Sequence, residues 1–156
     1  MNKSFPDPAK CLDKARRYCV FQERSQQEVR DKLYAWGLHR KEVEEIISGL
    51  ISDGYLKEER FAVAFAGGKF RIKQWGRIKI RQALKIKKVS EPLIREALAS
   101  ISEADYRKTL VKVLESREAK INESHPLKRK LMLARYAIQR GFEPELVSEV
   151  LNAGQD

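Results

Sequence analysis

Nine basic side chains stand between Lys69 and Lys88 with no acidic residue among them. They are Lys69, Arg71, Lys73, Arg77, Lys79, Arg81, Lys85, Lys87 and Lys88. The chain of 156 residues has a net charge of +10, and without these nine it retains 23 basic against 22 acidic residues. Ammonium and guanidinium groups at this density attract phosphates, because they replace the counterions of a polyanion. This basic segment therefore predicts contact with a nucleic acid or another polyanion.

An indole, Trp75, lies within the basic segment. Such a ring can stack on an unpaired base while the neighbouring cations bind phosphates. Alternatively, Trp75 closes the end of the hydrophobic core and the cations form a solvated face; Trp36, at another predicted helix end, favours this packing role. The candidate DNA-binding or filament-binding residues are Lys69, Arg71, Lys73, Trp75, Arg77, Lys79, Arg81, Lys85 and Lys88.

The residue types that usually carry catalysis are sparse. Only His39 and His125 could act as bases at neutral pH, and neither has a Cys, Ser or carboxylate at a spacing that indicates a nucleophile or a metal site. Cys11 and Cys19 are separated by ~12 Å of rise on one predicted helix, too far for a disulfide. We therefore expect no enzymatic activity, no cofactor and no metal, and two buried free cysteines.

Composition sets the class of protein. Hydrophobic residues make up 42% of the chain and charged residues 35%, which is typical of a soluble, highly charged helical protein. No apolar run approaches the roughly 18 residues that a membrane span needs. Residues 1–10 contain no apolar stretch of the kind found in signal peptides, so we expect a cytoplasmic protein with no membrane partner.

The elements that position these residues recur three times. Counting from Gly37, Lys88 and Gly141, which are about fifty residues apart, apolar side chains return at offsets −8, −4, +1, +6, +9 and +10. These offsets share a face only in helices, so each unit contains two helices joined by a tight turn. A third helix precedes each pair, at about 8–22, 57–73 and 103–120. The sequence predicts an all-α fold of nine helices without a strand.

The three predicted units cover residues 1–54, 55–101 and 102–156, and the second carries the basic segment. Because about fifty residues bury only a thin core, neighbouring units are expected to share apolar surface and to stack as an elongated, curved array. Tyr55 and Phe61 are expected to pack between the first and second units.

The turn between the paired helices needs a left-handed residue. Glycine adopts this conformation without a steric penalty, as expected at Gly37 and Gly141. Lys88 breaks the pattern: either it adopts the conformation at a cost of ~1 kcal/mol, or the turn of the second unit is built differently.

Three segments resemble signature motifs of the bacterial RecX family. They are SQQEVRDKL at 25–33, GYLKEERFA at 54–62 and GRIKIRQAL at 76–84. The chain departs from the family pattern at Arg77, commonly proline, at Ala83, commonly glutamate, and at Lys88, commonly glycine. The resemblance implies a non-catalytic, all-helical modulator of three tandem three-helix repeats that binds the RecA recombinase filament on DNA. Its implied role is to restrain this filament in DNA repair, recombination and the SOS response.

Two other functions remain open. One is a stand-alone helix-turn-helix regulator whose helix from Arg77 to Lys87 enters the major groove, although ordinary helical repeats use the same two-helix geometry. The other is a scaffold whose basic segment meets an acidic protein surface. Because no apolar seam remains unassigned for dimerisation, we expect a monomer that binds single- or double-stranded DNA weakly and without sequence preference.

Overall fold

Helix formation follows the capping signals of the sequence. Before the first helix, the carboxylate of Asp7 accepts a hydrogen bond from the Ala9 N–H at 3.0 Å. Before the second, the Glu28 N–H donates to Ser25 Oγ at 3.0 Å, and the Ser25 N–H donates to Glu28 Oε1 at 3.1 Å. These side chains satisfy amide groups that have no partner within a first helical turn.

The structure, a computed structural model, describes residues 6–153. Over this range the chain forms nine helices and no strand, which confirms the all-α prediction. The helices are α1 (Pro8–Phe21), α2 (Gln26–Ala35), α3 (Arg40–Ser52), α4 (Glu58–Lys73), α5 (Arg77–Ile86), α6 (Glu91–Ala99), α7 (Glu103–Glu118), α8 (Pro126–Gln139) and α9 (Pro144–Ala153).

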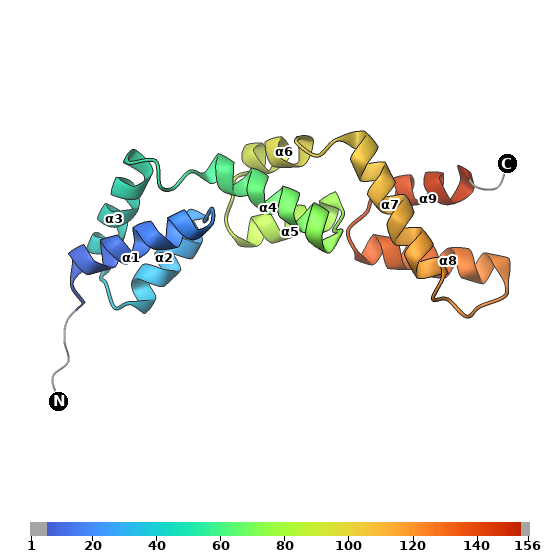
Figure 1. Cartoon of the computed structure of the whole chain (residues 1–156), viewed down its shortest axis with the longest axis horizontal. Coiled ribbons are helices and arrows are strands. Elements are labelled where there is room, and N and C mark those ends of the chain that lie inside the picture. Colours follow the sequence, from blue (N-terminus) through green and yellow to red (C-terminus); the bar gives the residue numbers. More distant parts are fainter. Residues whose placement is uncertain (1–5, 154–156) are drawn as a thin grey trace, which may run out of the picture.

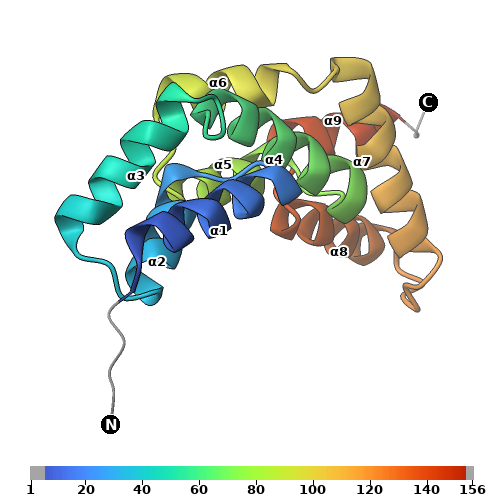
Figure 2. The same cartoon turned by 60° about the vertical axis from the view of Figure 1, so that its left-hand side comes forward.

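Three groups of three helices follow one another along the long axis of the molecule (Figure 1). The first repeat comprises α1–α3, the second α4–α6 and the third α7–α9. The turned view shows that the array bends into an arch (Figure 2). The predicted elongated, curved array of three-helix repeats is confirmed.

Apolar side chains form two separate cores. The first repeat has its own core between Cys11 and Leu56, and both cysteines are buried there without a disulfide, as predicted. The second core runs from Phe61 to Val147 and is common to the second and third repeats. The prediction that neighbouring repeats share apolar surface is thus confirmed for the second and third repeats. It is wrong for the first and second repeats.

The junction between the first two repeats is polar. The Gln26 N–H donates to Glu58 Oε1 at 2.6 Å, and Arg60 pairs with Glu23 at 3.0 Å. The prediction that Tyr55 and Phe61 pack between these repeats is wrong. Tyr55 lies against the first core and Phe61 in the second, because the chain crosses from one core to the other between them and α4 packs on α6.

The three tight turns are equivalent, including the one without glycine. Gly37 has φ +94° and Gly141 has φ +100°, and Lys88 takes the same left-handed conformation at φ +62°. The Lys88 N–H donates to the Lys85 carbonyl at 2.9 Å, as the Gly37 N–H does to the Tyr34 carbonyl. Lysine therefore adopts the left-handed conformation, at a cost of ~1 kcal/mol, and the turn keeps its geometry.

Within residues 6–153, no helix has both the length and the hydrophobicity needed to cross a membrane.

Candidate nucleic-acid and filament interface

The basic segment folds as the end of α4, a short corner and α5. Helix α4 ends at Lys73, and Gln74 then takes a left-handed conformation with φ +55°. Basic residues in the last turn of α4 stabilise it, because the carboxyl end of a helix carries partial negative charge. The chain reverses over Trp75, and α5 begins after Gly76.

The amino end of α5 has no capping side chain of its own, and the third repeat caps it instead. The Arg77 N–H donates to the Tyr106 hydroxyl at 2.9 Å, and the Ile78 N–H donates to the Gly141 carbonyl at 3.0 Å. The Gly76 N–H donates to the Arg140 carbonyl at 2.8 Å. The corner before α5 is therefore joined directly to the turn between α8 and α9.

Two glycines make this joint possible. A Cβ on Gly76 would lie 2.3 Å from the Gly141 carbonyl carbon, and a Cβ on Gly141 would lie 2.4 Å from the Lys79 Cβ. No side chain fits at either position without moving the backbone of the other turn. We refer to the contact of Gly76, Arg77, Tyr106, Gly141 and Glu143 as the repeat joint.

Arg77 belongs to the repeat joint. Its guanidinium pairs with Glu143 at 2.7 Å and with Glu103, and it lies 3.7 Å from the centre of the Tyr106 ring. Burial raises the pKa of the Tyr106 hydroxyl, which also donates a hydrogen bond to Glu143. The candidate residue Arg77 therefore ties the second repeat to the third through its charge.

Two further candidates have acidic partners within the chain. Arg81 pairs with Glu91 of α6, and Lys85 lies 4.0 Å from the same carboxylate. Arg81 and Lys85 are four residues apart on α5 and would repel each other, and Glu91 of α6 supplies the opposite charge. Lys88, at the far end of α5, lines a small cleft that also includes Glu58 at the junction with the first repeat.

Trp75 and two lysines form a cluster at the corner. Trp75 is half-buried against the second core, and the Nζ atoms of Lys69 and Lys79 lie 4.9 and 4.6 Å from the centre of its ring. The indole thus packs on the core as well as attracting cations. Among residues 6–153, neither lysine pairs with a carboxylate, nor does exposed Lys73 one turn beyond Lys69. We call Lys69, Lys73 and Lys79 the corner lysines.

The third repeat contributes cations that we did not identify from the sequence. Arg71 lines a cleft of about 260 Å³ together with Lys108 and Lys112 of α7, beside one acidic residue, Asp105. The two lysines are four residues apart on α7, the spacing that also separates Arg77, Arg81 and Lys85 on α5. The near-neutral charge of the third repeat as a whole obscured this signal.

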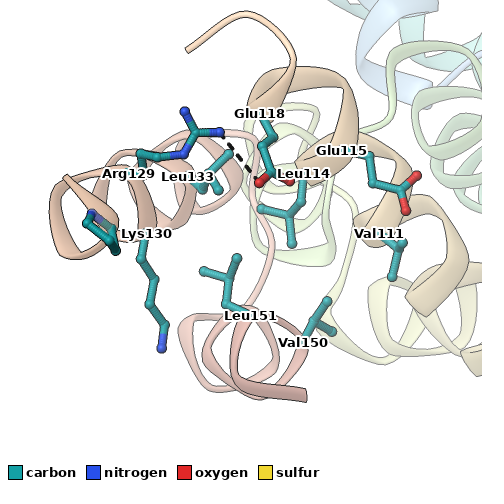
Figure 3. A pocket seen from close by; sticks show the side chains of 10 residues that line it. Val111, Leu114, Glu115, Glu118, Arg129, Lys130, Leu133, Val150 and Leu151 are labelled. Carbon is teal, nitrogen blue, oxygen red and sulfur yellow. Dashed lines mark hydrogen bonds and ion pairs between the residues drawn. The ribbon is translucent and has the colours of Figure 1, made fainter. Parts of the chain in front are cut away.

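A larger groove of about 530 Å³ opens between the helices of the third repeat (Figure 3). Its floor is apolar and includes Leu114, Leu133 and Leu151. Its rim carries both charges, and Glu118 pairs with Arg129 across it at 3.5 Å. The groove therefore shows no preference for an anionic ligand.

Within residues 6–153, no group of three or more His, Cys, Asp or Glu side chains could hold a metal ion.

Comparisons with known proteins point to one family. Residues 11–50 match the profile of "RecX, first three-helix domain", and residues 58–98 match that of "RecX, second three-helix domain". The "Regulatory protein RecX" of Thermotoga petrophila is 33% identical over 144 residues, covering 92% of this chain and 83% of that protein. That of Bacillus licheniformis is 28% identical over 145 residues, covering 93% of this chain. This chain spans 55% of the length of the Bacillus relative and 66% of a Clostridium tetani relative of the same name.

A solved structure has the same architecture. The "Crystal structure of RecX from Lactobacillus salivarius" superimposes with a TM-score of 0.84, covering 94% of this chain and 95% of that one. The two sequences are 18% identical, so the likeness concerns the fold alone.

Proposed function

Because this chain belongs to the RecX family of regulatory proteins, we propose that it binds the filament that the RecA recombinase forms on DNA and restrains ATP hydrolysis and strand exchange by that filament. It acts in the cytoplasm, as a monomer and without a catalytic step of its own. Family membership, the elongated array and the distribution of unpaired cations support this function.

The repeat joint and the shared second core support restraint by binding alone. Together they hold the second and third repeats in one fixed arrangement. A ligand shifts a conformational equilibrium only through its different affinities for the two states. A rigid body that spans neighbouring recombinase protomers would bind one filament conformation better than another. Inhibition of the filament would then need no catalytic step.

The main observation in favour of DNA binding is that positive charge remains unpaired at the α4–α5 corner. Intramolecular carboxylates neutralise Arg77 and Arg81, whereas the corner lysines have none within the described residues. Arg71, Lys108 and Lys112 extend the positive charge onto α7. If these six cations contact phosphates, the affinity for DNA should fall ~1,000-fold between 50 and 200 mM salt, whatever the base sequence.

Replacing the corner lysines with glutamine tests this contact. We expect Lys69→Gln, Lys73→Gln and Lys79→Gln together to weaken binding of a labelled single strand at least about tenfold and to flatten its salt dependence. A control that removes the same charge from exposed sites elsewhere is Lys10→Gln, Lys41→Gln and Lys120→Gln. Equal loss in both triple variants would show that only net charge matters, and the corner contact would be rejected.

The filament itself is tested by measuring ATP hydrolysis by the cognate recombinase on single-stranded DNA. Substoichiometric inhibition by the wild-type chain is the expected result. No inhibition, combined with tight binding to a defined duplex, would support the helix-turn-helix regulator instead. The repeat joint already weighs against that alternative, because the amino end of α5, which such regulators insert into the groove, contacts the third repeat.

A further inference from the structure

Helix α8 has two apolar faces, and only one of them packs inside the protein. Leu133 and Ala137 are buried in the second core. On another side of the helix, Leu127, Leu131 and Ile138 leave 60%, 59% and 41% of their surface exposed. The sequence-based prediction that no apolar seam remains unassigned is therefore wrong.

The exposed residues follow the spacing of a helix-pairing seam. With the partly buried Ala134 they stand at intervals of four, three and four residues. This alternation keeps side chains on one narrow line along a helix and is the spacing through which two helices interlock. We call Leu127, Leu131, Ala134 and Ile138 the α8 stripe.

The other two repeats show that their architecture does not need this stripe. In register with Leu131, Ala134 and Ile138, the second repeat has Ile78, Arg81 and Lys85, and the first has Gln27, Arg30 and Tyr34. There the middle position is an arginine that pairs with a glutamate of the same repeat, Arg30 with Glu44 at 2.8 Å and Arg81 with Glu91. The third repeat replaces this internal ion pair with an apolar line.

The charges beside the α8 stripe indicate what can cover it. Helix α8 contains no acidic residue, and basic side chains lie on both sides of the stripe, with Lys130 on one side and Lys128 and Arg135 on the other. Lys128 and Arg135 are exposed and form no ion pair with any residue in 6–153. An apolar line between cations is complementary to a helix that carries apolar residues between acidic ones.

We propose that the α8 stripe is a docking surface for an acidic amphipathic helix of a partner protein. A second copy of this chain would set lysine and arginine against lysine and arginine, which opposes pairing through α8. A lipid surface requires a broad apolar face, whereas the stripe is about one side chain wide. DNA offers phosphates to the cations but nothing to the three aliphatic side chains. This inference does not rest on the proposed function, because the stripe lies outside the basic segment.

The test uses two synthetic helical peptides that share leucines at alternating intervals of four and three residues. One carries glutamate at the flanking positions and the other carries lysine. Fluorescence anisotropy should show at least about tenfold tighter binding of the acidic peptide to the full chain. The variant Leu127→Gln, Leu131→Gln and Ile138→Gln should lose about tenfold or more of this affinity.

A matched control removes apolar surface elsewhere. Ile72 and Ile86 are 81% and 80% exposed on the second repeat, so Ile72→Gln with Ile86→Gln should leave peptide binding unchanged. Reversing the flanks with Lys128→Glu and Arg135→Glu should transfer the preference to the basic peptide. Circular dichroism of every variant checks that the helices persist.

Four results would overturn the proposal. The first two are equal affinity of the full chain for the two peptides, and equal loss of affinity for the acidic peptide in the stripe variant and the control. The other two are a dimer in sedimentation that the stripe variant abolishes, and binding of the full chain to phosphatidylglycerol vesicles that requires the stripe. A fifth contrary result is loss of single-stranded DNA binding in the stripe variant, because DNA and not a partner helix would then contact these aliphatic side chains. Inhibition of the recombinase is measured in a separate assay. Failure of the α8 docking surface therefore does not affect the proposed filament binding, and failure of filament binding does not affect the docking surface.

Discussion

Replacing Gly141 with alanine should destabilise the repeat joint strongly. Two costs add at this position. Gly141 has φ +100°, which costs an alanine about 1 kcal/mol. The new methyl would also lie 2.4 Å from the Lys79 Cβ and 2.7 Å from its backbone nitrogen, and overpacking of this kind costs roughly 1–3 kcal/mol. We therefore expect a total loss of about 2–4 kcal/mol in the free energy of unfolding.

Gly54 provides a matched control. Its φ is +79°, but apart from Gly54 itself and its two chain neighbours no atom lies within 4 Å of the position that a Cβ would take. Gly54→Ala should therefore cost only the conformational term of about 1 kcal/mol. For a chain of this size 1 kcal/mol corresponds to ~2–4 °C in Tm, so the two variants should differ by several degrees.

Scanning calorimetry measures the loss, and amide hydrogen exchange locates it. The Arg77 and Ile78 amides donate to the third repeat, and they should exchange faster in Gly141→Ala than in the wild type, whereas in Gly54→Ala they should not. Equal destabilisation by the two alanines, or unchanged exchange at the start of α5, would refute the close backbone approach of the two turns.

Three further predictions concern single side chains. Lys88→Gly should raise the free energy of unfolding in urea by about 1 kcal/mol, because glycine adopts the left-handed φ of +62° without strain. A lower free energy of unfolding would mean that the lysine side chain stabilises the turn. Burial at the junction raises the pKa of Glu58 above 4.5, so the folded chain binds this proton more tightly than the unfolded one, and stability should fall as pH rises from 4.5 toward neutral. Glu58→Gln keeps the acceptor for the Gln26 N–H and should flatten this dependence; an unaltered pH profile would reject the assignment. Tyr106→Phe should cost roughly 1–3 kcal/mol in thermal unfolding, because Glu143 loses a buried donor; a neutral effect would show that water replaces the hydroxyl.

The sequence alone was sufficient for the local architecture. Residues spaced for one helical face, such as Val29 with Leu33 and Ile80 with Leu84, are all fully buried. Register also placed Lys88 at the position of the glycine turns, but whether that turn keeps its geometry was decided only by the left-handed φ of +62° in the structure. These features depend on neighbours in the sequence, which a linear pattern records.

Only the tertiary structure decided which cations remain available and which repeats act as one body. Arg77 resembled a surface cation, but its partners, Glu103 and Glu143, come from the third repeat, and their distance in sequence hid the pairing. The threefold repeat predicted that all neighbouring units share apolar surface, yet the core of the first repeat is separate and that of the second and third repeats is shared. Helical periodicity fixes which side of each helix is apolar, whereas the contacts between repeats depend on how three-dimensional surfaces meet, and a period of about fifty residues carries no information on that.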